Sequence, residues 1–133
     1  KRAAFALLLF ITLTALGLPL LSGGRGGLGV FASPSVGFIV GFPLAALVAG
    51  WITSKLKLIN VFYSSLLGAV VGGILILYIP GIVGMSIMLD KSISEAALIA
   101  LIYLPGDCIK AFLCAMLTHT LFKLRPENVL SRI

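Results

Sequence analysis

Charged side chains are scarce in this sequence, and acidic ones are the scarcest. Asp, Glu, Lys and Arg make up 11% of the 133 residues, and only four residues are acidic. No pair of carboxylates is placed for acid–base catalysis, and the sequence contains no Ser-His-Asp set and no glycine-rich phosphate loop. We therefore predict a protein that is not itself an enzyme.

Cysteine and histidine are also rare. Cys108 and Cys114 lie six residues apart on one expected helix and point away from each other, so we expect two buried thiols and no disulfide. His119 is the only histidine, and it has no Cys, Asp or Glu at metal-ligand spacing. We expect His119 to pack in the helix or lie at an interface, and we predict no metal site and no cofactor in this chain.

Hydrophobic residues, by contrast, make up 60% of the chain. A soluble domain of this size could not solvate so much apolar surface. The net charge is +6, but no stripe of basic residues alternates with aromatic ones, so we expect no nucleic-acid partner. No long linker, low-complexity tract or internal repeat is visible. The sequence predicts an all-α integral membrane protein with one transmembrane domain over residues 1–133.

Four stretches approach the roughly 20 apolar residues that a helix needs to cross a bilayer. They are residues 3–21, 34–54, 58–80 and 106–123. The capping-box spacing of Ser92 and Glu95 predicts a further helix over residues 93–103, which is too short to cross and should pack at the outer membrane edge. Lys1 and Arg2 precede the first of several apolar stretches, so we predict a spanning helix there rather than a cleaved signal peptide.

Small residues recur every four positions in the second and third stretches. The second carries Gly37, Gly41, Ala45 and Ala49, and the third carries Gly68 and Gly72, with Ala69 and Gly73 beside them. Small residues at this spacing let helix backbones approach closely in lipid. The pattern predicts either internal packing of these two helices or a docking face for a partner subunit.

An acid and a base lie in the last apolar tract. Asp107 and Lys110 are three residues apart, and charged groups at membrane depth usually face a polar cavity, pair with each other or bind a ligand. Pro105 disfavours helical conformation at Leu104, so we predict a helix break and a new helix from Gly106. Two interpretations stay open. The pair is an ion pair at a helix start, or it is a site for a small molecule that carries N–H donors and an anionic group.

Residues 22–27 form a glycine-rich loop between the first two stretches. Glycine allows positive φ and close backbone approach to a ligand, but it also simply makes loops. Arg25 lies in this loop, and a guanidinium group can hold a carboxylate through two hydrogen bonds. We expect the loop on the same outer side of the membrane as Asp107 and Lys110.

Three aromatic residues lie where spans are expected to meet the membrane surface. Trp51, Tyr78 and Tyr103 fit the aromatic belt that forms at both interfaces of a membrane protein. This is the ordinary role of such side chains in membrane helices.

Three motifs, in this order, resemble the BioY family. They are Leu20-Leu21-Ser22-Gly23-Gly24-Arg25-Gly26-Gly27-Leu28-Gly29, Ser33-Pro34-Ser35-Val36-Gly37-Phe38-Ile39-Val40-Gly41-Phe42 and Leu104-Pro105-Gly106-Asp107-Cys108-Ile109-Lys110. The resemblance extends over essentially the entire chain, and the third motif is its most specific part. The second motif departs from the family's usual Gly-Pro-Thr-Gly-Gly-Tyr and retains only the proline and one glycine.

The resemblance implies the biotin-specific S component (substrate-capture subunit) of an energy-coupling factor (ECF) transporter. Such a protein has six membrane helices, lies in a bacterial-type inner or plasma membrane, and binds biotin in an outward-facing pocket. It assembles with a transmembrane coupling subunit and two cytosolic ATPase subunits, which hydrolyse ATP. By this resemblance the chain holds the last four of six helices, and because it does not begin with Met we expect a fragment or a processed product.

The resemblance also implies where biotin binds. Asp107 and Lys110 would correspond to polar ligand-binding residues of the last helix, and Arg25 would lie in a loop that closes over the site. The full set of expected substrate-binding residues is Asp107, Lys110, Arg25, Gly24, Gly26, Gly27, Ser35, Phe38 and Tyr103. Two alternatives are a carrier for another small molecule and a structural membrane subunit in which Asp107 and Lys110 only pair with each other.

The basic residues predict the orientation of the chain. With a cytoplasmic amino terminus, the cytoplasmic ends carry seven basic residues, namely Lys1, Arg2, Lys55, Lys57, Lys123, Arg125 and Arg132. The opposite side keeps three, namely Arg25, Lys91 and Lys110. This split agrees with the rule that cytoplasmic loops of membrane proteins carry an excess of Lys and Arg.

We therefore expect single cysteines introduced at Ser54 and at Ser92 to react from opposite sides of the membrane. The measurement is labelling of oriented vesicles with a thiol reagent that does not cross the bilayer, after Cys108 and Cys114 have been replaced by Ser. Labelling of both positions from one side would overturn the orientation.

Overall fold

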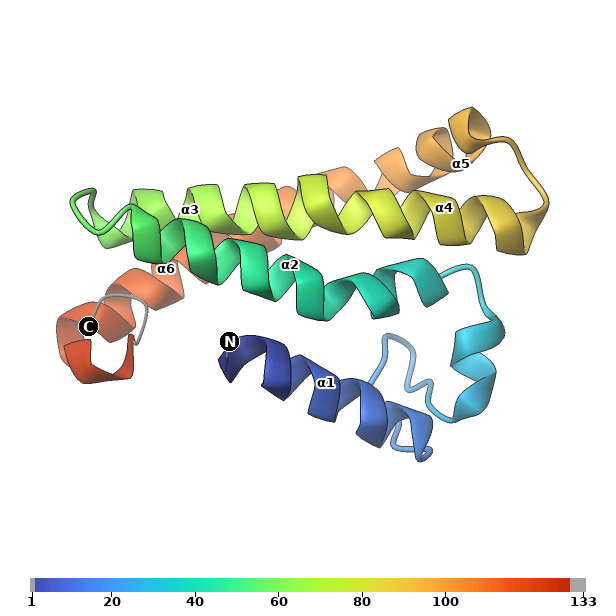
Figure 1. Ribbon diagram of the computed structural model, residues 1–133, viewed down its shortest axis with the longest axis horizontal. Helices are drawn as coiled ribbons and strands as arrows, with labels where there is room; N and C mark the ends of the chain where they lie inside the picture. Colours follow the sequence, from blue (N-terminus) through green and yellow to red (C-terminus); the bar gives the residue numbers. More distant parts are fainter. Residues whose placement is uncertain (1, 130–133) are drawn as a thin grey trace.

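The computed structural model describes residues 2–129, and most of them are helical (Figure 1). The α-helices in this range are α1 (Arg2–Ala15), α2 (Val36–Lys55), α3 (Val61–Val70), α4 (Leu77–Leu89), α5 (Ile93–Ala100) and α6 (Leu104–Leu124). Three short 3-10 helices, η1 (Leu28–Ala32), η3 (Leu101–Tyr103) and η4 (Pro126–Asn128), and one π-helix, η2 (Val71–Ile76), complete the elements. No β-strand forms within residues 2–129, where a single isolated bridge joins Leu21 to Arg25. The predicted all-α class is confirmed.

Several of these elements join end to end. α3, η2 and α4 form one helix of 29 residues, and α5, η3 and α6 form another of 32 residues. With the 20 residues of α2, these are the three helices of the described chain that are long and apolar enough to cross a membrane. α1 is apolar but shorter, with 14 residues.

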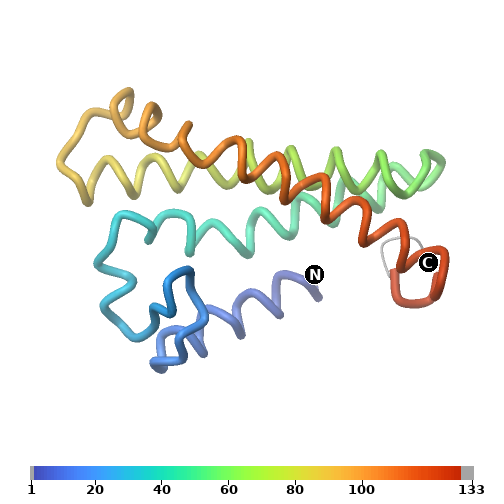
Figure 2. The backbone as a smooth tube through the Cα atoms, turned by 180° about the vertical axis from the view of Figure 1, so that it is seen from behind, coloured from blue at the N-terminus to red at the C-terminus, as the bar shows by residue number. Residues whose placement is uncertain are grey.

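α2 lies at the centre of the arrangement, between α1 on one side and the α3–α4 helix on the other (Figure 1). α6 packs against α3, and the view from behind shows it running obliquely across that helix (Figure 2). α5 packs against α4. The connection from α1 to α2 and the turn from α4 to α5 therefore lie at one end of the molecule, and the turn from α2 to α3 lies at the other.

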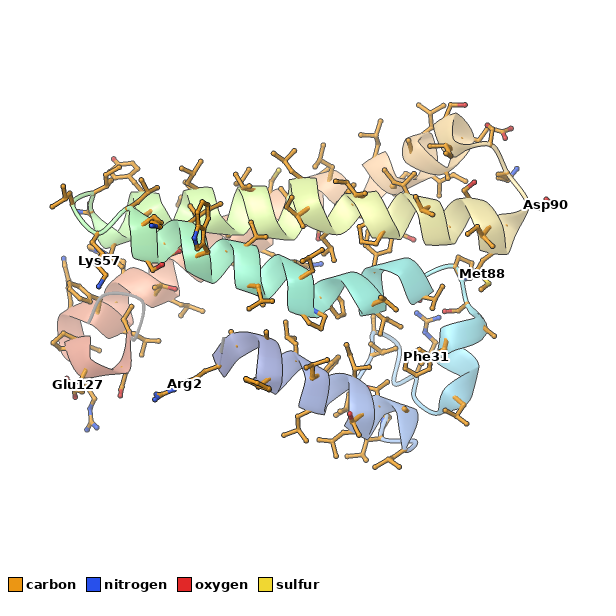
Figure 3. The ribbon with its side chains drawn as sticks, in the orientation of Figure 1. Arg2, Phe31, Lys57, Met88, Asp90 and Glu127 are labelled. Carbon is orange, nitrogen blue, oxygen red and sulfur yellow. The ribbon has the colours of Figure 1, made fainter. Side chains whose placement is uncertain are left out.

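The labelled charged residues divide between these two ends. Arg2, Lys57 and the acidic Glu127 lie toward the end that holds the α2–α3 turn, and Asp90 lies at the opposite end (Figure 3). Lys1 and Arg132, which the orientation prediction also used, lie outside the described residues. Arg2 and Lys57 thus lie toward the same end of the molecule and the α4–α5 turn at the other, as the predicted orientation requires. Which end faces the cytoplasm stays a prediction.

Small residues make the contact between α2 and the α3–α4 helix. We call the set Gly37, Gly41, Gly68, Gly72 and Gly84 the glycine seam. A Cβ atom at Gly37 would collide with the carbonyl oxygen of Pro80, and one at Gly72 would lie 2.5 Å from the carbonyl oxygen of Ala45. At Gly37 and Gly72 the backbones of the two helices therefore approach each other closely. Internal helix packing, one of the two interpretations of the small-residue pattern, is confirmed.

The third helix is longer than predicted. It was expected to end at Pro80, but Pro80 lies inside α4 and the helix continues to Leu89. A proline removes one backbone hydrogen bond, yet transmembrane helices tolerate it because neighbouring groups and local adjustments satisfy the freed carbonyl. The helix ends where Asp90 adopts a left-handed conformation (φ 51°) and its N–H donates to the Ser86 carbonyl.

The predicted break before Gly106 is wrong. Leu104 is helical, with φ −56° and ψ −44°, and Pro105 lies in the first turn of α6. In a regular α-helix, the ring of Pro105 would clash with the Leu101 carbonyl, four residues earlier. Here the Leu104 N–H donates to that carbonyl in a tighter 3-10 turn. The helix therefore continues through Pro105 without a break. Residues 93–103 are the opening turns of the long helix, and the predicted capping box of Ser92 and Glu95 at its start is confirmed.

The first helix is shorter than predicted. α1 ends at Ala15 rather than near residue 21. Gly17 has φ +107°, and the Gly17 N–H donates to the Thr14 carbonyl. This left-handed glycine ends the helix before Pro19 is reached.

We expect Gly37→Ala to destabilise the fold by about 1–3 kcal/mol, because the new methyl group would force α2 away from Pro80. The matched control is Gly50→Ala in the same helix, where a Cβ atom meets nothing within 4 Å. Alanine is the better helix former, so this variant should keep or slightly raise stability. The measurement is thermal unfolding of both variants in detergent, and equal stability of the two would contradict a packed seam.

Candidate functional site

The Asp107 carboxylate on α6 has a hydrogen-bond donor on each of its oxygens. Lys110 Nζ lies 3.0 Å from Asp107 Oδ1, and the Tyr78 hydroxyl on α4 donates to Asp107 Oδ2 at 2.7 Å. The Asp107 side chain is 20% exposed, and that of Lys110 is 79% exposed. The carboxylate is thus held in place between two helices, while the ammonium group stays accessible.

Aromatic rings continue this cluster onto α2. The ring of Phe38 meets the ring of Tyr78 edge to face, with centroids 5.7 Å apart, and the ring of Tyr103 with centroids 6.4 Å apart. Phe38 and Tyr78 are half-buried, and Tyr103 is exposed. Four of the expected site residues, Phe38, Tyr103, Asp107 and Lys110, therefore belong to one connected group with Tyr78 at its centre. We call these five residues the Asp107 cluster.

The glycine seam sets the position of Phe38. Its neighbour Gly37 packs against Pro80, and a Cβ atom at Gly81 would collide with the Phe38 ring. A side chain larger than hydrogen at Gly81 would displace that ring. The close approach of α2 and α4 therefore places an aromatic wall beside the carboxylate.

Tyr78 is the member of the cluster that sequence reasoning missed. Its assignment to the aromatic belt is wrong, because Tyr78 lies well inside the 29-residue helix and its hydroxyl is bonded to Asp107. A signal was available. A phenolic hydroxyl in the interior of an apolar helix needs a hydrogen-bond partner, and the sequence offers few acidic acceptors.

The glycine-rich loop folds back on itself. The Leu21 N–H donates to the Arg25 carbonyl and the Gly24 N–H to the Leu21 carbonyl, both at 3.0 Å. Gly24 and Gly27 have φ of +69° and +84°, a region that residues with side chains rarely adopt. The Gly27 N–H donates to the Thr14 carbonyl at 2.7 Å, which fastens the loop to the end of α1. Gly26 has no room for a side chain, because a Cβ atom there would collide with the Leu18 carbonyl.

Arg25 and Ser35 make their contacts within their own segments. The exposed Arg25 side chain donates from Nε to the Ser22 carbonyl at 3.2 Å. Ser35, just before α2, shares a 2.8 Å hydrogen bond with the Ser33 hydroxyl. The structure thus joins neither residue directly to the Asp107 cluster, although Ser35 lies three positions from Phe38 along the chain.

The opposite end of the molecule holds two open grooves. One, of about 410 Å³, is lined by Asn60, Phe62, Tyr63, Phe112, Met116, His119 and Thr120. The other, of about 380 Å³, is lined by Leu56, Ile59, Tyr63, Ser64, Leu66, Leu67 and Val70. His119 packs edge to face against Phe62, which confirms the expected packing role. Cys108 and Cys114 are exposed rather than buried, because they lie on faces of α6 that the other helices leave open.

The fold matches that of a solved transporter component. A crystal structure of the S-component for biotin from an ECF-type ABC transporter is similar to this chain, with a TM-score of 0.83 and 26% sequence identity. The similarity covers 90% of this chain and 65% of the solved one. The helical arrangement is therefore the S-component fold, and this chain accounts for about two thirds of the solved example.

The sequence comparison narrows this class to one family. The BioY family matches residues 1–127. The biotin transporter BioY of Rhodobacter capsulatus is 39% identical over 140 residues, which cover 98% of this chain and 74% of that protein. The biotin transporter BioY of Rhizobium etli is 40% identical over 124 residues, covering 88% of this chain and 65% of that protein. The chain belongs to the BioY family.

Proposed function

We propose that this chain binds biotin and serves in its uptake across the cell membrane as the substrate-binding S component of an ECF-type transporter. The observation that carries this function is the Asp107 carboxylate, held by Tyr78 and Lys110 beside an aromatic wall. Membership of the BioY family and the S-component fold support it. The family consists of transport proteins, so the chain is a multi-pass membrane protein and not an enzyme.

The cluster offers a partner for each chemical part of biotin. The ureido N–H groups of biotin are donors, and an ionised carboxylate accepts hydrogen bonds only. The valerate carboxylate of biotin suits the Lys110 ammonium or the Arg25 guanidinium. The thiophane ring and the alkyl chain are apolar and suit the rings of Phe38 and Tyr103.

Lys110 can serve the ligand without leaving Asp107. An ammonium group has three donors, and one of them is used by Asp107 Oδ1. Because the Lys110 side chain is 79% exposed, its other donors can reach a carboxylate brought by the ligand. The ion pair and the binding site are therefore compatible uses of the same two residues.

The glycine-rich loop supplies the cover of the proposed site. Gly24, Gly26 and Gly27 allow the tight turn, and Arg25 at its tip is exposed and cationic. Closure of this loop over bound biotin would bring the guanidinium group toward the ligand carboxylate. Ser35 lies where the chain enters α2 and offers a further hydroxyl group at that entrance.

Transport requires an energy source outside this chain. The sequence has no phosphate-binding loop, and the similar solved protein is described as a component of an ECF-type ABC transporter. We assign ATP hydrolysis to two cytosolic ATPase subunits and their connection to this protein to a transmembrane coupling subunit. The membrane would be a bacterial-type inner or plasma membrane.

We expect Asp107→Ala and Lys110→Ala to lower biotin affinity by about 30-fold or more, because each change removes a charged group that the proposed site uses to bond biotin. Losses of about 2–5 kcal/mol are typical when one partner of a hydrogen-bonded charge pair is removed from a binding interface. Asp107→Asn retains one acceptor oxygen and should lose less than Asp107→Ala. The measurement is equilibrium biotin binding to the purified full-length protein.

The control for the loss of charge is Lys91→Ala, which removes an exposed lysine beyond the end of α4 and should leave affinity unchanged. Thermal stability without biotin is recorded for every variant. If the variants at Asp107 and Lys110 keep wild-type affinity while their stability collapses, the pair is an internal brace and the proposed site is wrong.

We expect Gly24→Ala and Gly27→Ala to weaken biotin binding by about 5–30-fold while changing stability without ligand much less. The left-handed conformations of Gly24 and Gly27 would cost a residue with a side chain about 1–2 kcal/mol each. We expect the exposed loop to relax out of this conformation at little cost without biotin, and to require it when it covers bound biotin. Gly29→Ala is the control, because a Cβ atom there meets nothing within 4 Å and its φ is not positive. Equal losses of binding and of stability would show that the loop is a fixed structural turn.

A further inference from the structure

Within residues 2–129, the Tyr78 hydroxyl is the group that hydrogen-bonds Asp107 from a different long helix. It donates to Asp107 Oδ2 at 2.7 Å from the interior of the α3–α4 helix, while Lys110 bonds the other oxygen from within α6. The Tyr78 ring is itself held edge to face by Phe38 of α2. Three helices thus fix the position of one carboxylate.

The direction of Tyr78 depends on the π-helical turn η2. On the α3–α4 helix, the positions that meet α2 include Gly68, Gly72, Leu77, Pro80 and Gly84. Successive steps between them are four, five, three and four residues, and the step of five spans η2. In a regular α-helix each residue turns by about 100°, so an extra residue would turn the second half of the helix away from α2. The wider π-turn absorbs that residue and keeps both halves on the glycine seam.

Tyr78 follows directly after Leu77, which meets α2 at Gly41. With Leu77 fixed against α2, the next side chain points to the side where α6 lies, and there it meets Asp107. Without the extra residue in η2, the Tyr78 side chain would point about 100° away from its present direction. The π-turn and the Tyr78–Asp107 hydrogen bond are therefore linked by the register of one helix.

We propose that Tyr78 is a positioning residue of the binding site, which fixes the plane of the Asp107 carboxylate so that its free lone pairs face the N–H donors of the ligand. This role rests on the proposed function, because it concerns the same ligand. A carboxylate on a flexible side chain would lose rotamer freedom when the ligand binds, and the Tyr78 bond removes that loss in advance. Because Tyr78 and Lys110 both donate to Asp107, the carboxylate stays an acceptor and selects ligands that bring donors.

The test is a double-mutant cycle on biotin binding to the purified protein, with Tyr78→Phe, Asp107→Ala and the double variant. Tyr78→Phe removes only the hydroxyl, and we expect biotin affinity to fall about fivefold to tenfold, the size typical of one hydrogen bond. In the Asp107→Ala background the same change should alter affinity less than twofold, because the group on which Tyr78 acts is gone. Independent losses that multiply in the double variant would overturn the positioning role.

The affinity for a second ligand distinguishes a positioning role of Tyr78 from a purely structural one. A biotin analogue methylated on its ureido nitrogens cannot donate to Asp107, so Tyr78→Phe should leave the affinity for this analogue within about twofold of the wild type. Equal weakening of biotin and of the analogue would point to general damage and would overturn the inference. Tyr63→Phe, on a ring that lines the groove at the other end of the molecule, is the control and should bind both ligands as the wild type does.

The two levels of the proposal fail in different ways. If the wild-type protein binds biotin and Tyr78→Phe binds it equally well, the positioning role is wrong and the proposed function stands. If the wild-type protein does not bind biotin, both are wrong. Thermal stability of Tyr78→Phe without ligand should stay close to the wild type, since the aromatic ring and its contact with Phe38 are kept.

Discussion

The close approach of two helix backbones along the glycine seam is the contact on which the rest of the structure depends. In lipid no hydrophobic effect drives helices together, so association relies on dispersion between closely packed atoms and on the few available hydrogen bonds. Glycine at Gly37 and Gly72 lets α2 touch the α3–α4 helix directly. That contact fixes the register in which Phe38 and Tyr78 stand, and through them the place where α6 can dock with Asp107.

The electrostatics of the cluster follow from the scarcity of charged and polar side chains in this sequence. The Asp107 carboxylate lies in an apolar wall and needs hydrogen-bond donors nearby. It has one donor from its own helix, Lys110, and one from α4, Tyr78. Each bond offsets part of the cost of removing a charge from water. Because Lys110 is exposed, the cluster is accessible to a ligand from one side, whereas a fully enclosed ion pair would be inaccessible.

Much of this fold could be predicted from the sequence, because membrane helices are specified by composition and by small-residue spacing. α2, the Ser92–Glu95 capping box and the pairing of the glycine ladders all agree with those local rules. The two errors at prolines, the early end expected at Pro80 and the break expected before Gly106, have one physical origin. Rules for Pro80 and Pro105 come from helices in water, whereas here neighbouring helices and a 3-10 turn satisfy the backbone that each proline disturbs. Tyr78 was missed because its partner lies 29 residues away in the chain, and a register shift inside a π-turn leaves no clear mark in the sequence.

The unbroken helix through Pro105 also allows the depth of Asp107 in the membrane to be estimated. Asp107 and Lys123 lie on the same α-helix, α6, and are separated by 16 residues, a rise of about 24 Å at 1.5 Å per residue. Lysines near helix ends extend to the membrane surface, so Lys123 marks one boundary of the roughly 30 Å hydrocarbon layer. Asp107 then lies about 6 Å below the opposite boundary when the helix stands upright, and deeper when it tilts. A solute that reached the carboxylate from that side would therefore have to lose its hydration water within about 6 Å of the hydrocarbon boundary, a distance comparable to the thickness of one headgroup layer.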